Sequence, residues 1–204
     1  GWIAQIWIVN MGVMLVSAGG LHWYFYTRKA QAKTLKFSHR DMMRENRTFK
    51  FGDQVKDNLF WSLTSGVAQI TVFQAVSFWL MANGYVPTIT FTSNPILFIA
   101  IILALPIWSA FHFYWVHRFL HVPFMYTRVH SLHHRNINIG PWSGFSMHPV
   151  EHFFYLTSLC IHWILPSSPI HIAFHVMYLA PGAAMTHTGY ESLLVKDKRQ
   201  LELG

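Results

Sequence analysis

Long apolar stretches alternate with short polar ones along this chain, and three of the apolar stretches are long enough to cross a bilayer. They cover residues 2–26, 59–82 and 95–121. About 20 apolar residues in a helix cross a hydrocarbon core about 30 Å thick, so each stretch predicts a membrane-spanning helix. The first is too long for a cleaved signal peptide and lacks its basic start.

Residues that start and end helices refine these bounds. Asp53 and Asp57 stand where the second helix would place its N-cap and a first-turn acid. Pro123 ends the third helix, because proline disfavours helical geometry at the residue before it. As a helix, residues 95–121 rise roughly 40 Å, which is more than the hydrocarbon core. We therefore expect the end that carries His117 to leave the lipid.

Two shorter apolar stretches follow, at residues 150–165 and 169–186, joined by a Pro-Ser-Ser-Pro turn. Both are short for a full span, so this hairpin over residues 150–186 either crosses the membrane or is re-entrant. Polar residues within the spans, such as Asn10, are expected to bond neighbouring helices. The predicted fold is an all-α integral membrane protein, a single domain over residues 1–204 with about four to five membrane helices.

Composition supports a membrane protein over a soluble one. Hydrophobic residues make up 52% of the chain and charged residues only 11%, whereas charged residues form about a quarter of an ordinary soluble domain. A soluble all-α protein with a large core is the alternative, and the long apolar runs disfavour it. The single cysteine, Cys160, excludes an internal disulfide and a thiolate cluster. Any metal must therefore be held by nitrogen and oxygen.

Charge follows the predicted topology. All 15 Lys and Arg lie in residues 28–58, 117–149 and 187–204, which share one membrane face if the spans and the hairpin alternate. The positive-inside rule makes that face cytoplasmic. The basic loop 28–58 is then chiefly a topology signal, with a docking face for an acidic redox partner as the alternative. The net charge of +7 comes without a nucleic-acid-binding motif, so we expect no nucleic-acid partner.

Histidines are concentrated on the same face. Twelve of the fourteen fall between residues 112 and 187. Three pairs have the i, i+4 spacing: His117/His121, His130/His134 and His148/His152. Side chains with this spacing share one face of a helix about one turn apart, so both can reach one ion. His133 joins His130 at i+3. These pairs predict a histidine-bound metal centre.

The number of imidazoles indicates more than one ion. Six candidates are His117, His121, His130, His133, His134 and His187, with His148 and His152 as possible further ligands. A mononuclear catalytic zinc uses about three protein ligands, so this excess suggests two metals. Imidazole suits iron, zinc, copper and nickel alike, and the residues alone do not choose among them. Isolated histidines, such as His112, His162 and His175, are more simply hydrogen-bonded structural residues.

The ordered motifs resemble the fatty acid hydroxylase / sterol desaturase superfamily. They are Y-W-V-H-R-F-L-H at 114–121, H-S-L-H-H at 130–134, M-H-P-V-E at 147–151 and H-T-G-Y-E at 187–191. The resemblance covers roughly residues 60–191. It implies a di-iron membrane oxygenase that hydroxylates or desaturates a lipid C–H bond with O₂, and zinc could substitute for the iron. It also implies electrons from a small redox protein of cytochrome b5 or ferredoxin type.

The resemblance assigns His117 and His121 to a first box, His130, His133 and His134 to a second, and His187 to a later single ligand. A third box, H-x-x-H-H, is expected after the last motif, and the chain reaches Gly204 without it. We therefore expect a C-terminally truncated chain, with a chain that never had this box as the alternative.

Two glutamates belong to these motifs. Glu151 is expected to hold the far ring nitrogen of a ligand histidine, and Glu191 to do the same or bind metal. In the motif M-H-P-V-E at 147–151, His148 is either a ligand or the residue that starts a helix at Pro149. Phe111, Trp115 and Phe119 are expected to wall the substrate path.

Two other functions remain open. A haem-binding electron carrier would use histidines at mid-membrane depth, such as His162 and His175, and would leave the boxes unexplained. A metal transporter or non-catalytic membrane subunit would need polar groups through the spans, and the sequence offers few. The substrate, whether sterol or fatty acyl, is not decided by these residues.

Overall fold

Three long helices dominate the computed structural model, which describes residues 1–31, 33, 35–195 and 199–202. They are Trp2–Thr27, Gln54–Ala82 and Pro95–Leu120, each long and apolar enough to cross a membrane. The predicted helical membrane fold is thereby confirmed. The second helix begins five residues before the predicted 59, because the Asp53 side chain caps it by accepting the Lys56 N–H at 3.0 Å.

The first two long helices are each made of several segments. The first comprises α1 (Trp2–Met14), α2 (Gly20–His22) and two π-helical segments, η1 (Leu15–Gly19) and η2 (Trp23–Thr27). The second comprises α3 (Gln54–Phe60), the π-helical η3 (Trp61–Gly66) and α4 (Val67–Ala82). The third is α5 (Pro95–Leu120), which begins behind an Asn94 cap.

Shorter elements complete the chain. They are α6 (Pro123–Met125), η4 (Tyr126–His130), α7 (Ser131–His134), η5 (Ser143–Phe145), α8 (Pro149–Leu156), η6 (Thr157–Trp163), α9 (Pro169–Thr186), β1 (Ser192–Val195) and β2 (Arg199–Glu202). The two strands pair as an antiparallel hairpin, a small addition to the predicted helical fold. The α8–η6–α9 hairpin is not among the three helices fit to span a membrane.

The core lies where α1, α4, α8, η6 and α9 meet. Its most buried members include Met14, Val67, Ile70, Leu156 and Ala184. Within this bundle Asn10 of α1 donates to Thr71 at 3.1 Å and to Gln74 at 2.7 Å in α4. The predicted interhelical role of Asn10 is confirmed.

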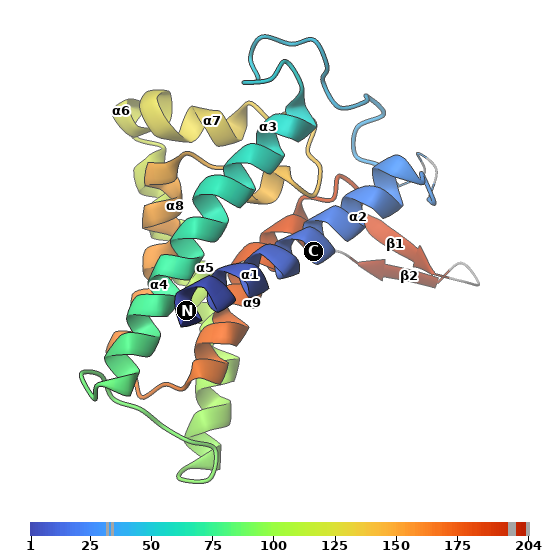
Figure 1. The fold of residues 1–204 in the computed structure, drawn as a ribbon. Coiled ribbons are helices and arrows are strands. Elements are labelled where there is room, and N and C mark those ends of the chain that lie inside the picture. Colours follow the sequence, from blue (N-terminus) through green and yellow to red (C-terminus); the bar gives the residue numbers. More distant parts are fainter. Residues whose placement is uncertain (32, 34, 196–198, 203–204) are drawn as a thin grey trace.

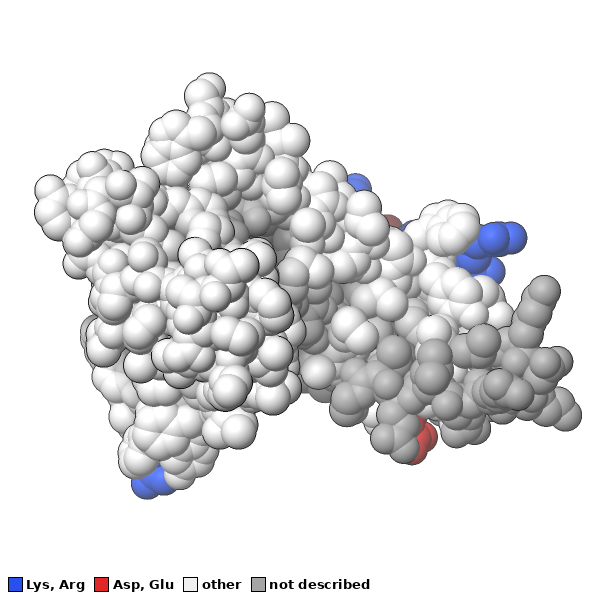
Figure 2. Space-filling model, turned by 90° about the horizontal axis from the view of Figure 1, so that it is seen from below, with Lys and Arg blue, Asp and Glu red and all other residues white. Residues whose placement is uncertain are grey.

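The outer surface of the bundle is apolar. Ile96 and Ile107 on α5 are 82% and 73% exposed, and the described residues on the face in Figure 2 show charged side chains only near its margins. Exposing apolar side chains to water is unfavourable, whereas contact with apolar lipid chains removes them from water. The protein is therefore a membrane protein.

One segment caps this bundle. The run α6–η4–α7 lies across one end of the bundle, at a steep angle to α4 and α5 (Figure 1). Pro123 turns the chain into it directly after α5 ends. The histidines at the end of α5 are thereby placed beside those of the capping segment.

Candidate metal centre

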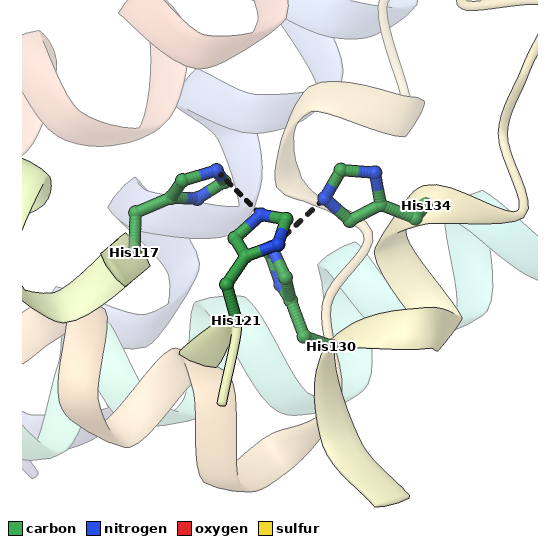
Figure 3. A group of neighbouring side chains, drawn as sticks. All are labelled: His117, His121, His130 and His134. Atoms are coloured by element: carbon green, nitrogen blue, oxygen red, sulfur yellow. Dashed lines mark hydrogen bonds between the residues drawn. The ribbon is translucent and has the colours of Figure 1, made fainter. Parts of the chain in front are cut away.

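Four histidines, from the end of α5 and from the capping segment, converge at this end of the bundle. They are His117 in the last turn of α5, His121 just after it, and His130 and His134 from η4 and α7 (Figure 3). One ring nitrogen from each lies within 4.8 Å of the others. The i, i+4 spacing aligns each pair on its own helix, and the turn at Pro123 brings the two pairs together.

Within each i, i+4 pair, the spacing between ring nitrogens fits ligands of one ion. His117 Nε2 and His121 Nε2 are 3.0 Å apart, and His130 Nε2 and His134 Nε2 are 2.9 Å apart. Two nitrogens that each lie about 2.0–2.1 Å from one ion are separated by roughly 2.9–3.3 Å. His121 and His134 are exposed while His130 is buried, so the group faces solvent on one side and the bundle on the other.

His133 and His187 form a neighbouring pair. Their ring centroids lie 5.6 Å apart. His133 Nδ1 is 3.2 Å from the Ser146 carbonyl, and His187 Nδ1 is 2.9 Å from the Ala183 carbonyl. A carbonyl only accepts, so each Nδ1 carries the proton and each Nε2 keeps its lone pair. That is the tautomer in which Nε2 can bind a metal.

Burial keeps these imidazoles neutral. It lowers the pKa of His130 to about 4 and that of His133 to about 3, and His187 lowers the pKa of His133 further. Burial also lowers the pKa of His134 and His187. Neutral imidazole is the metal-binding form, so these side chains are ready for a cation at pH 7.

Glu151 of α8 holds one of the histidines from behind. Its side chain is only 3% exposed, and its Oε1 lies 2.7 Å from His130 Nδ1. Burial raises the pKa of this carboxyl to about 9. A cation bound at His130 Nε2 would favour the carboxylate, which would then accept the Nδ1–H. Glu151 thus lies where the role predicted for it requires.

A cavity of about 350 Å³ opens directly beneath the histidines. His117, His130, His133 and His187 line one end of it, and Ser109 and Phe113 line the part along α5. Apart from these groups its walls are mostly apolar or aromatic, from α5, α8 and α9. Its size is that of a small-molecule site.

The residues predicted to wall the substrate path do not lie at the cavity. Phe111, Trp115 and Phe119 are 58%, 54% and 44% exposed and do not line the cavity. Ser109, Phe113 and His117 do, because they lie at steps of four and share one face of α5. Counting back from His117 in steps of four would have found them.

Other predicted residues lie outside the group of four. His148 is the N-cap of α8 and accepts the Val150 N–H at 3.2 Å. Both ring nitrogens of His152 are occupied, by Ser65 Oγ at 3.0 Å and the Phe145 carbonyl at 3.2 Å. The Glu191 side chain is exposed, and its backbone N–H bonds Leu35. The structure therefore does not bring these three side chains to the cluster.

One supporting network was missed by the sequence reasoning. Asp57, which is fully buried, pairs with Arg135 directly after the second box. Gln54 and Asn58 donate to Asn136 Oδ1 at 3.1 and 2.9 Å. These side chains of α3 hold the segment that follows α7. Their i, i+3, i+4 spacing just before a predicted span was the available signal.

Comparison with known protein families identifies the family of the chain that carries this site. The fatty acid hydroxylase family matches residues 101–202, which is half of the chain. The chain belongs to the fatty acid hydroxylase family. The matched region holds all six histidines of the cluster and its neighbouring pair, and the predicted resemblance is confirmed.

Two relatives to which the chain is similar are fungal desaturases. The chain is 40% identical over 65 residues to a Delta(7)-sterol 5(6)-desaturase of Aspergillus fumigatus, a match that covers 32% of this chain and 17% of the relative. It is 32% identical over 93 residues to a Delta(7)-sterol 5(6)-desaturase of Schizosaccharomyces pombe, covering 46% and 28%. The matches thus span less than a third of either relative. No solved structure matches the chain.

Proposed function

We propose that this protein is an iron-dependent membrane oxidoreductase that hydroxylates or desaturates a C–H bond of a sterol or fatty-acyl lipid. The observation that carries the proposal is a set of neutral imidazoles at one end of a largely apolar cavity inside a membrane bundle. Membership in the fatty acid hydroxylase family and the names of the fungal relatives support the same chemistry.

His117, His121, His130 and His134 are the proposed ligands of one ion. His133 and His187 would serve a second ion, for which two imidazoles fall short of the usual three protein ligands. A further H-x-x-H-H box of the kind that the family resemblance implies would supply the missing donors. Bound iron would supply redox activation of O₂, which zinc, having no redox chemistry, cannot supply.

The protein's own groups position the ligands and the substrate. Glu151 and the carbonyls of Ser146 and Ala183 would fix the tautomers of His130, His133 and His187, which would leave the Nε2 of each free to bind its metal. Phe113 and the other apolar walls exclude water and admit an apolar chain. The substrate carbon to be oxidised would lie at the histidine end.

The membrane face that carries the histidines is the proposed cytoplasmic side and the side of electron entry. Arg118, Arg128 and Arg135 flank the histidine boxes in the sequence, and the basic loop 28–58 lies on the same predicted face. The positive-inside rule makes that face cytoplasmic. His121 and His134 are exposed there, so a small redox protein of cytochrome b5 or ferredoxin type would approach them without crossing lipid.

The alternative of a haem-binding electron carrier is not supported by the arrangement of His162 and His175, the two histidines that it would use. His162 Nε2 and His175 Nδ1 are 3.0 Å apart, and their other nitrogens contact Ser167 and Ser109 at 2.9 Å. A porphyrin has to lie between its two axial histidines, and these rings are in direct contact.

The test is metal content together with lipid products of the full-length protein. We expect His117→Ala and His133→Ala to lose bound iron and product, while the matched variant His39→Ala, in an exposed loop position, keeps both. Oxidised lipid formed at undiminished rate by either cluster variant would refute the proposal.

A further inference from the structure

A second, smaller cavity lies at the end of the first long helix, apart from the histidines. Its volume is about 80 Å³, and three lysines line it: Lys29, Lys33 and Lys36. Asp41 is the only acid among its lining residues. With three ammonium groups and one carboxylate, the described lining residues carry a net charge of +2. A concave site with this charge selects anions.

The floor of this lysine pocket is formed by packed aromatic rings. Phe25 is buried and stacks on Tyr190, with ring centroids 4.4 Å apart. Lys36 forms a backbone bridge to Tyr190, and its ammonium lies 5.2 Å from the centre of the Tyr26 ring. The lysine pocket is therefore built on the packed end of the first helix and on the segment that follows His187.

Lys36 is the residue that most needs a ligand. It is only 8% exposed, and an ammonium has three donors. Among the described residues its Nζ donates to one acceptor, the Arg40 carbonyl at 2.8 Å. Burial lowers the pKa of this lysine, and Asp41 opposes that shift. A buried cation with donors to spare is stabilised by an anion.

The rim adds two further cations that water can reach. Lys29 and Lys33 are exposed. The Lys33 ammonium lies 3.7 Å from Asp41, whose side chain is 83% exposed, so water screens that pair. Thr27, the last residue of the first long helix, is two residues from Lys29. The lysine pocket thus lies at the level where lipid headgroups meet water.

We propose that the lysine pocket binds a phosphate group, as carried by the headgroup of an anionic membrane lipid. Lys36 contacts the phosphate from the floor, and Lys29 and Lys33 contact it from the rim. The aromatic floor excludes water beneath it. Because Tyr190 belongs to that floor, an occupied pocket also fixes the segment directly after His187.

The experiment measures thermal protection of the detergent-solubilised chain by three probes: dioctanoyl phosphatidic acid, dioctanoyl phosphatidylcholine and inorganic phosphate. A ligand that binds only the folded state raises the melting temperature, and the rise grows with the logarithm of its concentration divided by its Kd. We expect phosphatidic acid to protect and phosphatidylcholine to have no effect. Protection by inorganic phosphate as well would identify free phosphate as a second source of the same ligand.

Charge-matched variants make the test specific to the lysine pocket. Each lysine near an anionic surface is worth about a factor of five, so Lys29→Gln/Lys33→Gln should weaken binding of phosphatidic acid about thirty-fold. The control Arg47→Gln/Lys56→Gln removes the same charge at exposed positions elsewhere in the loop and in α3, and should change binding less than two-fold. Lys36→Gln should abolish protection, and its melt without ligand reports whether it folds.

Equal weakening by the two double variants would show general surface attraction and would overturn the proposal. So would phosphatidylcholine protecting as well as phosphatidic acid, or no protection by any probe. Failure of the oxygenase proposal would leave these results unaffected, because no histidine of the cluster is changed.

Discussion

Replacing Glu151 with Gln separates metal binding from folding. The substitution keeps the shape of the side chain and removes its ability to become a carboxylate. In the metal-free protein burial raises the pKa of Glu151 to about 9, so at pH 7 the acid is already neutral and Gln resembles it. We therefore expect the melting temperature of the metal-free protein to stay nearly unchanged.

Metal affinity should respond strongly to the same change. A cation on His130 favours a charged acceptor at Nδ1, which Glu151 Oε1 supplies at 2.7 Å. Removing such a partner typically weakens metal binding 10–100-fold, or about 1.4–2.8 kcal/mol. Chelator competition at pH 7 measures this, and Glu191→Gln, at an exposed carboxylate, is the matched control.

The pH dependence gives a second readout of Glu151→Gln. If metal binding expels the Glu151 proton, affinity in the unaltered protein rises with pH up to about 9, the pKa of that carboxyl. The pKa of His130 is near 4, so this histidine adds no slope above pH 6. The variant should lose most of the slope. An unchanged affinity and an unchanged slope together would refute the role assigned to Glu151.

Two further outcomes concern stability. Asp57→Asn removes the buried carboxylate that pairs with Arg135 and should destabilise the fold by about 2 kcal/mol. Breaking a fully buried pair costs about 3–5 kcal/mol, and we expect less here because Arg135 is partly exposed. An unshifted urea midpoint would contradict this. Burial lowers the pKa of His130 and His133 to about 4 and 3, below the unfolded value of about 6.5. The unfolded chain therefore binds more protons in that window. Metal-free protein should lose stability as pH falls from about 6.5 toward 4, as melts across that range would show.

The sequence by itself determined the features that depend on local spacing and on solvent. The length and apolarity of the three long stretches required helices in lipid, because only a helix satisfies every backbone polar group within its own segment. The i, i+4 spacing of His117 and His121 placed both on one helix face. The motif order sufficed to indicate the family. Each of these follows from residues near one another in the chain.

Tertiary structure decided what depends on residues far apart. His130 and His152 look alike in the sequence, yet His130 faces the cavity while His152 is bonded to Ser65 and Phe145 inside the core. Packing of α8 against α3–α4 and against the capping segment sets that difference. Lys36 became a pocket floor only because residues 188–190 fold back beside the first helix. Spacing fixes which side chains share a face, but only packing fixes what that face meets.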